Sequence, residues 1–124
     1  MKVLMKRANT VTDGILVQLG ASNIVEPLST GVLLGVASQC RVIQVQDNFD
    51  VPVESYDVCD VVMSGDSQAI LEGDASAVGG LLYPATDGKV SVIANGEPIG
   101  RLAPRALSAL QNYNDGELVN VSLF

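Results

Sequence analysis

The sequence predicts a mainly all-β protein, a small β-sandwich or β-barrel of about eight short strands with a flexible N-terminal arm. Short apolar runs recur along the 124 residues and are separated by Gly, Asn, Asp and Pro turns at the spacing typical of sandwiches and barrels. The chain is 48% apolar, but it contains no Trp and only three Tyr and two Phe. The core must therefore be built from Val, Leu, Ile and Ala, which suit strand packing.

Residues 1–14 are expected to be the arm, and residues 15–124 a single β-rich domain. A chain of 124 residues can bury one core but leaves little room for a second domain. Three of the seven basic residues lie in the arm, and no apolar segment of a signal peptide follows them. No run approaches the roughly 18 apolar residues of a membrane span. We therefore expect a soluble protein made in the cytoplasm.

The first half contains several strand signals. Residues 15–19 (ILVQL) predict a strand that ends at Gly20, and residues 32–37 predict another, with an internal glycine that indicates a bulge or a close backbone approach. Residues 41–46 alternate between apolar and polar side chains, as a half-buried strand does. The acidic segment that follows is broken by Pro52, which favours a loop or an edge strand before residues 58–63 return to the core.

The second half is organised around the stretch 64–92, where two tightly turned β units fit into fewer than thirty residues. Strands are expected at residues 68–72, 81–83 and 90–93. The turn Asn95-Gly96 predicts a type I′ hairpin that joins residues 90–93 to residues 99–102. Five glycines are expected to be structural and to tolerate Ala poorly wherever φ is positive. They are Gly73, Gly79, Gly80, Gly88 and Gly96.

The end of the chain predicts one short helix and one strand. Leu107 and Leu110 lie at helical spacing behind Pro104, so a helix is expected near residues 104–111. From Leu118 onward, apolar and polar residues alternate, which predicts a closing strand.

The residues that most enzymes use are missing. The sequence contains no His, which removes the usual general base and the commonest metal ligand. It has no nucleophile motif, no phosphate-binding loop and no dinucleotide fingerprint. Cys40 and Cys59 lie far from any C-x-x-C pattern and are expected to be free thiols. We therefore expect no enzyme, no catalytic residue, no cofactor and no metal.

Acidic side chains dominate the middle of the chain. Eight carboxylates and no Lys or Arg lie between Asp47 and Asp74, and the net charge is −7. Nucleic acid and membrane surfaces are therefore poor partners. Ca²⁺ could bind a cluster of four of these carboxylates, but their spacing fits no EF-hand loop, which favours a solvated acidic surface. The four are Asp47, Asp50, Asp57 and Asp60.

Three motifs together resemble one family. They are the pattern G-D-(x)4-G-G-L-L-Y-(x)4-G-K-V from Gly73 to Val90, the pair Ile99-Gly100, and the ending Gly-Glu-Leu-Val-Asn-Val-Ser-Leu. They are similar to the small head decoration proteins of tailed bacteriophages, of the cement or capsid-fibre type. The resemblance covers residues 31–124 and includes the run from Gly31 to Ala37. The acidic segment 47–60 and the basic arm depart from the pattern.

The resemblance implies a structural protein that lies on the capsid exterior of a virion and stabilises the lattice of the major capsid protein. It also implies a homo-oligomer, with a trimer favoured, and no catalytic group. Alternatives are another virion component (head fibre base, tail or baseplate) and a β domain that binds a small ligand or Ca²⁺.

The residues expected at the partner interface are basic or apolar groups in polar surroundings. They are Lys2, Lys6, Arg7, Phe49, Val51, Pro52 and Tyr56. Phe49 and Tyr56 have a second interpretation, in which they cap the core under the loop. If the arm docks on a neighbour, removal of residues 1–12 should weaken attachment and leave the fold intact.

Overall fold

The structure is a computed structural model that describes residues 1–75, 79–104 and 112–124. These residues form ten strands and two short 3-10 turns, which confirms an all-β fold. The strands are β1 (Lys2–Lys6), β2 (Leu16–Leu19), β3 (Val25–Pro27), β4 (Leu33–Val45), β5 (Glu54–Val62), β6 (Gly65–Ile70), β7 (Leu81–Pro84), β8 (Val90–Ser91), β9 (Gly100–Leu102) and β10 (Leu118–Leu123). The 3-10 turns are η1 (Ala21–Asn23) and η2 (Thr86–Gly88). The helix predicted at 104–111 falls on residues 105–111, which lie outside the described residues.

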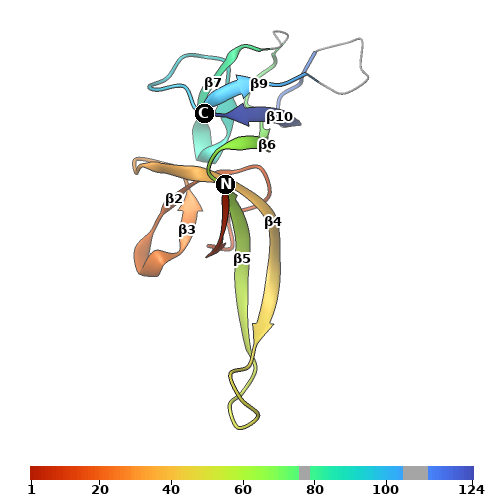
Figure 1. Ribbon diagram of the computed structural model, residues 1–124. Helices are drawn as coiled ribbons and strands as arrows, with labels where there is room; N and C mark the ends of the chain where they lie inside the picture. The colour runs from red at the N-terminus through yellow and green to blue at the C-terminus, as the bar shows by residue number, and fades with distance from the viewer. Residues whose placement is uncertain (76–78, 105–111) are drawn as a thin grey trace.

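The strands form two antiparallel sheets of five, one from each half of the chain (Figure 1). The first sheet has the order β1-β5-β4-β2-β3, and the second has the order β6-β10-β9-β7-β8. Each sheet curls until its two edges meet at a parallel bridge, Arg7 with Val25 in the first sheet and Leu71 with Val90 in the second. Each half is therefore a small curled sheet closed at one end, not one flat layer of a sandwich.

The two sheets have the same topology. Adding five to each strand number of the first sheet gives the order of the second. Residues 14–37 and 79–102 correspond at a constant separation of 65 positions, and η1 and η2 keep the same separation. Gly14 and Gly79 both have positive φ, and their N–H groups donate to Ala37 at 2.8 Å and to Leu102 at 2.7 Å. The chain is thus a structural repeat, which the sequence analysis did not detect.

The repeat is faint in the sequence because few positions are identical. Between residues 14–37 and residues 79–102, five pairs of residues match. They are Gly14 with Gly79, Leu16 with Leu81, Val25 with Val90, Gly31 with Gly96 and Gly35 with Gly100. Several of these positions are constrained by the backbone, whereas the core positions have exchanged one apolar side chain for another.

The described residues form two hydrophobic cores. The first lies inside the first sheet and the second inside the second sheet. The second core also includes Leu16, Leu28 and Val36 from the outer side of the first sheet. Because successive strand residues point to opposite faces, Leu16 contributes to one core and Val17 to the other, and both are fully buried. The first sheet is therefore apolar on both faces, and this joins the two halves.

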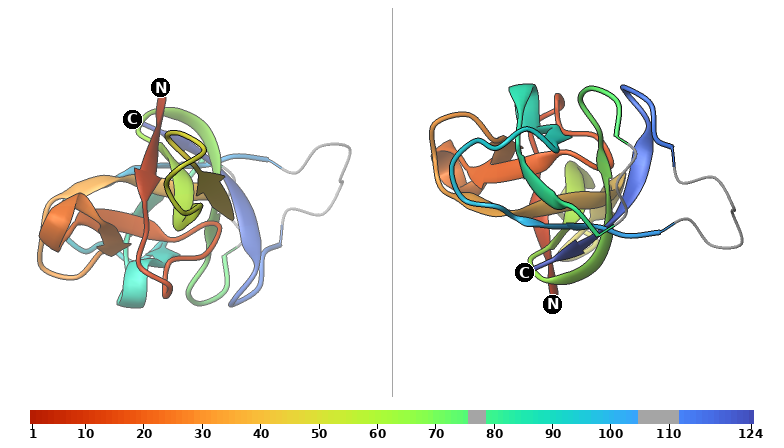
Figure 2. Two further views of the ribbon diagram at one scale, coloured as in Figure 1. Left: turned by 90° about the horizontal axis from the view of Figure 1, so that it is seen from below. Right: turned by 90° about the horizontal axis from the view of Figure 1, so that it is seen from above.

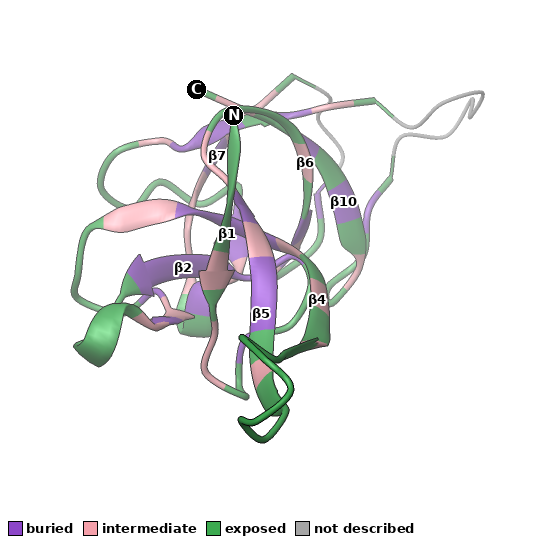
Figure 3. Ribbon diagram, turned by 60° about the horizontal axis from the view of Figure 1, so that its bottom comes forward, coloured by how far each residue is buried: buried purple, intermediate pink, exposed green. Residues whose placement is uncertain are grey.

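Strands β4 and β5 are the longest of the described strands and extend beyond the body as a hairpin (Figure 1), which the left view of Figure 2 shows end-on. Its outer part, residues 44–55, is exposed throughout, and Figure 3 shows this end of the hairpin free of buried residues. Residues 32–37 and 41–46, predicted as two strands, belong to one strand with a bulge between Ser38 and Arg41. At the bulge, Gln39 has a φ of 51°.

The prediction of a flexible arm at residues 1–14 is wrong. Strand β1 pairs with β5 at every position from Lys2 to Lys6, and Val11 is fully buried in the first core. Lysines are common on edge strands because they discourage pairing with other chains, so the basic character suits this position. Removal of residues 1–12 would take away an edge strand and a core residue. The fold should then be lost, contrary to the expectation from the sequence.

The prediction of a hairpin at Asn95-Gly96 is also wrong. Strand β7 lies between β8 and β9 and pairs with both, so residues 92–99 form a connection that passes over β7. Gly96 has a φ of 70°, but Asn95 does not have positive φ, whereas a type I′ turn needs it at both residues. Asn95 instead donates its side-chain amide to the carbonyl of Pro84 at 3.0 Å.

Of the five glycines predicted to be structural, four have positive φ: Gly73, Gly79, Gly88 and Gly96. Gly88 is the most constrained of these, since a Cβ atom there would lie 2.6 Å from the carbonyl oxygen of Leu16. Gly80 is not among the residues with positive φ.

Substitution of Gly35 or Gly100 by Ala should destabilise the protein to a similar degree. A Cβ atom at Gly35 would lie 2.4 Å from the carbonyl oxygen of Val62, and one at Gly100 would lie 2.3 Å from that of Ser122. We expect each substitution to lower the free energy of unfolding by about 2–3 kcal/mol in urea denaturation. The control is Gly116→Ala, which has positive φ but open space around the Cβ position and should cost about 1 kcal/mol. Equal losses in all three variants would contradict the close approach.

Candidate interaction surface

The hairpin exposes more apolar surface than its polar sequence suggests. Phe49 at its tip is 99% exposed. Four valines on the same hairpin are also exposed: Val42, Val45, Val51 and Val53. We call these five side chains the hairpin surface. Apolar groups gathered on a projecting element are typical of a contact site.

The tip is ordered by its own hydrogen bonds. The side-chain amide of Gln46 donates to the carbonyl of Val51 at 2.7 Å, and the backbone N–H of Asp50 donates to the side chain of Asn48 at 2.9 Å. Such local bonds fix a turn that has no core beneath it. Phe49 is therefore displayed by a defined turn and does not cap the core, which settles its second interpretation.

The hairpin surface is surrounded by negative charge. Asp47, Asp50 and Glu54 lie on the exposed outer part of the hairpin. The sequence contains no Lys or Arg between Arg41 and Lys89. A partner that accepts this surface should therefore present an apolar site with basic residues at its rim.

The base of the hairpin contains three residues predicted at the interface. Lys6 places its ammonium group 4.3 Å from the ring centre of Tyr56, a cation–π contact across β1 and β5. The hydroxyl of Tyr56 donates to the carboxylate of Glu54, and this bond raises the pKa of Tyr56 above its ordinary value.

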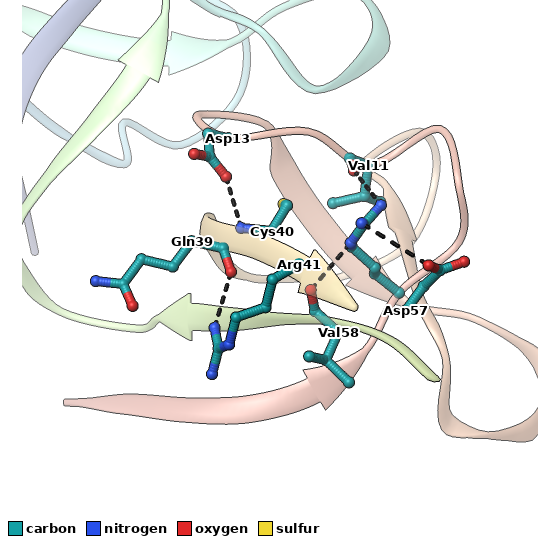
Figure 4. A network of polar contacts seen from close by, with 8 residues as sticks. Val11, Asp13, Gln39, Cys40, Arg41, Asp57 and Val58 are labelled. Atoms are coloured by element: carbon teal, nitrogen blue, oxygen red, sulfur yellow. Dashed lines mark hydrogen bonds and ion pairs between the residues drawn. The ribbon is translucent and has the colours of Figure 1, made fainter. Parts of the chain in front are cut away.

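The side chain of Arg7 is only 14% exposed, and Figure 4 labels its three partners, Val11, Asp57 and Val58. Its guanidinium donates to the carbonyls of Val58 at 3.0 Å and Val11 at 3.2 Å, and it lies 4.0 Å from the carboxylate of Asp57. Arg7 thus ties the loop after β1 to the base of the hairpin, and its polar groups are engaged inside the protein.

The structure brings together only part of the predicted interface. Phe49, Val51 and Pro52 lie at the tip, and Lys6 and Tyr56 lie together at the base. Lys2 lies at the other end of β1, opposite Val62. Val42 and Val45 were missed, because alternation in residues 41–46 was interpreted as half burial. Val53, in the acidic segment that follows, was also missed.

The four carboxylates considered for Ca²⁺ do not gather. Asp57 faces Arg7, and Asp60 lies 3.5 Å from Arg41. Asp47 and Asp50 lie in the hairpin loop. In the part of the chain that the structure describes, no three acidic or thiol side chains are placed to hold a metal ion. The arrangement therefore gives no support to the alternative of a Ca²⁺ site.

An open cleft of about 630 Å³ lies between β1 and β6, where the two halves meet. Most of its lining residues have polar side chains, including Ser38, Ser64 and Ser67, although apolar atoms also contribute to the lining. Two of its side chains are bonded to each other, since Gln68 donates to Asn120 at 3.2 Å. This cleft is one of several open clefts in the part of the chain that the structure describes, and it is the candidate place for a small ligand under the alternative of a ligand-binding domain.

These features define an all-β protein made of two similar curled sheets with one projecting hairpin. The chain is similar in structure to the N base of the head fibre gp8.5 of bacteriophage phi29, with a TM-score of 0.61 and 15% sequence identity. The match covers 100% of this chain and 93% of that one. No protein-family model and no curated protein matches the chain. At this identity, the likeness establishes the fold.

Among the described residues there is also no helix long and apolar enough to cross a membrane.

Replacing Arg7 by Met should destabilise the protein, because two carbonyl oxygens lose their charged donor. We expect the free energy of unfolding to fall by about 1–3 kcal/mol in urea denaturation. Lys6→Met is the matched control, since it removes a neighbouring basic group whose contact with Tyr56 is at the surface, and its loss should be smaller. A loss for Arg7→Met no larger than that of the control would show that Arg7 does not hold the hairpin base.

Proposed function

We propose that the protein is a structural component of a tailed-bacteriophage virion. In this proposal it binds the outside of the capsid as a decoration protein and stabilises the lattice of the major capsid protein. The observation that carries the proposal is the fold likeness to a phage head fibre base along the whole chain. The sequence motifs from Gly73 to Val90 support the same class of protein. A role without catalysis agrees with a sequence that contains no His.

The hairpin surface is the proposed contact with the capsid. A fully exposed aromatic residue at the tip of a hairpin that also exposes four valines can fill an apolar pocket, and such anchors provide most of the binding energy of many interfaces. The carboxylates around it would select a pocket with a basic rim. In the trimer that the sequence resemblance favours, three hairpins would bind together, so modest single contacts would add up to stable attachment.

The base of a head fibre is the second candidate, and the likeness in fold to the N base of the phi29 head fibre favours it. Both candidates place the protein on a phage head. They differ in what binding does to the shell: a decoration protein stabilises the lattice, whereas a fibre base serves mainly as an attachment point.

Co-sedimentation with capsids that lack the protein tests the proposal. Saturable binding, together with capsids that resist a higher temperature before they break, is the expected result for a decoration protein. Saturable binding without a change in capsid stability would favour the fibre base. A protein that binds no capsid in this assay would contradict both candidates.

Phe49→Ser should weaken capsid binding by at least about tenfold, which corresponds to about 1.4 kcal/mol and is within the range of a central apolar anchor. Because Phe49 is 99% exposed, its replacement should leave the melting temperature unchanged. Phe124→Ser is the matched control: the same substitution at a residue that is 64% exposed near the opposite end of the molecule. Loss of binding in Phe124→Ser and not in Phe49→Ser would place the contact on the other side of the protein.

A further inference from the structure

The bulge in β4 places two cysteines on neighbouring strands. The pairing of β4 with β5 runs from Ser38 opposite Asp60 directly to Arg41 opposite Val58. Gln39 and Cys40 therefore share a single opposite residue, Cys59. Opposed residues of antiparallel strands have Cα atoms about 4.5–5.5 Å apart, within the roughly 4.4–6.8 Å that a disulfide spans.

The two side chains lie on the same side of the sheet. Cys59 is fully buried in the first core, and Cys40 packs against that core and is partly exposed. Both are free thiols, and each is close enough to affect the pKa of the other. Figure 4 shows Cys40 and Gln39 pointing away from each other on β4.

Asp13 and burial keep the Cys40 thiol protonated. Its backbone N–H donates to the carboxylate of Asp13 at 2.8 Å. Burial, then a hydrogen bond from the thiol to Asp13 and the charge of Asp13, raise the pKa of Cys40 to about 12. Burial also raises the pKa of Cys59. Because the thiolate is the reactive form, both cysteines should stay reduced until an oxidant is present for a long time.

We propose that Cys40 and Cys59 form a disulfide on exposure to a disulfide oxidant such as oxidised glutathione, and that this bond locks the hairpin to the first sheet. The proposal does not depend on the proposed function.

The reaction is an ordinary thiol–disulfide exchange in two steps. The partly exposed Cys40 loses its proton and attacks one sulfur of oxidised glutathione, which forms a mixed disulfide and releases one glutathione thiolate. Cys59 then loses its proton and attacks the sulfur of Cys40, which releases the second glutathione. Two protein thiols are oxidised, one glutathione disulfide is reduced, and the two protons pass to the two released glutathiones.

The disulfide would link β4 and β5 at the point where their pairing is interrupted. The bulge interrupts the pairing between β4 and β5, and Gln39 adopts a left-handed backbone conformation there. From the bulge to the tip, β5 is the only one of the described strands that pairs with β4. A covalent link at the bulge would therefore restrict changes in the angle between the hairpin and the body.

The test incubates the full chain with oxidised glutathione near pH 9 and compares it with the same sample kept in a reducing agent. We expect an intact mass lower by two hydrogens, no free thiol in denaturant, and a non-reducing digest that links the peptides of Cys40 and Cys59. The melting temperature should rise by roughly 10 °C, as expected for a disulfide that closes a short loop. Amide hydrogen exchange in residues 42–56 should become slower.

Two variants sharpen the test. Cys40→Ser cannot form the bond and should show neither the thermal shift nor the slower exchange. Asp13→Asn keeps an oxygen acceptor for the N–H of Cys40 but removes the negative charge, so oxidation should become faster. Two thiols that remain free after prolonged exposure, a reaction that stops at the mixed disulfide, or a link between two chains would overturn the disulfide. A disulfide that leaves exchange in residues 42–56 unchanged would overturn the locking.

Discussion

The meeting of the two edge strands within each half is the constraint on which the rest of the structure depends. In the first half, the N–H of Ala8 donates to Val25 at 2.9 Å, and in the second half the N–H of Glu72 donates to Val90 at 2.7 Å. A five-stranded sheet can close in this way only if it curls tightly, which brings strands together at Gly35 and at Gly100. A tightly curled sheet encloses little space, and this explains why the interior consists mainly of Val, Leu and Ala and why the sequence contains no Trp.

The two halves share a scaffold, and in the first half that scaffold carries the element proposed to make contact. Strands β4 and β5 are 13 and 9 residues long, whereas the corresponding β9 and β10 are 3 and 6 residues long. The extra length forms the hairpin, with Arg7 and the Lys6–Tyr56 contact holding its base. The body thus presents one projecting hairpin with exposed apolar side chains, in the way that binding elements are often added to a scaffold.

Much of the fold could be predicted from the sequence, because strand periods and turn glycines are local signals. Alternation in residues 118–124 and the short apolar runs at residues 15–19 and 81–83 led to β10, β2 and β7. The failures have a common cause, since strand pairing is decided by distant residues. Residues 2–6 resemble a basic arm until β5 pairs with them, and Asn95-Gly96 gives a local hairpin signal that β7 overrides. In the candidate surface, Phe49 was found because it is apolar in a polar segment. Val42 and Val45 were missed, since no local signal shows how far a strand extends beyond the body.

The sharing of the second core has a consequence for the order in which the protein forms during synthesis. All strands of the first sheet lie before residue 63, and among the described residues of the second half only Ile70 packs against its core, at the edge. This half can close while the rest of the chain is still on the ribosome. The second sheet requires Leu16, Leu28 and Val36 to complete its interior, so it assembles on a surface that is already folded. The first sheet is therefore synthesised, and can fold, before the second half. The second half then folds against a surface that is already in place.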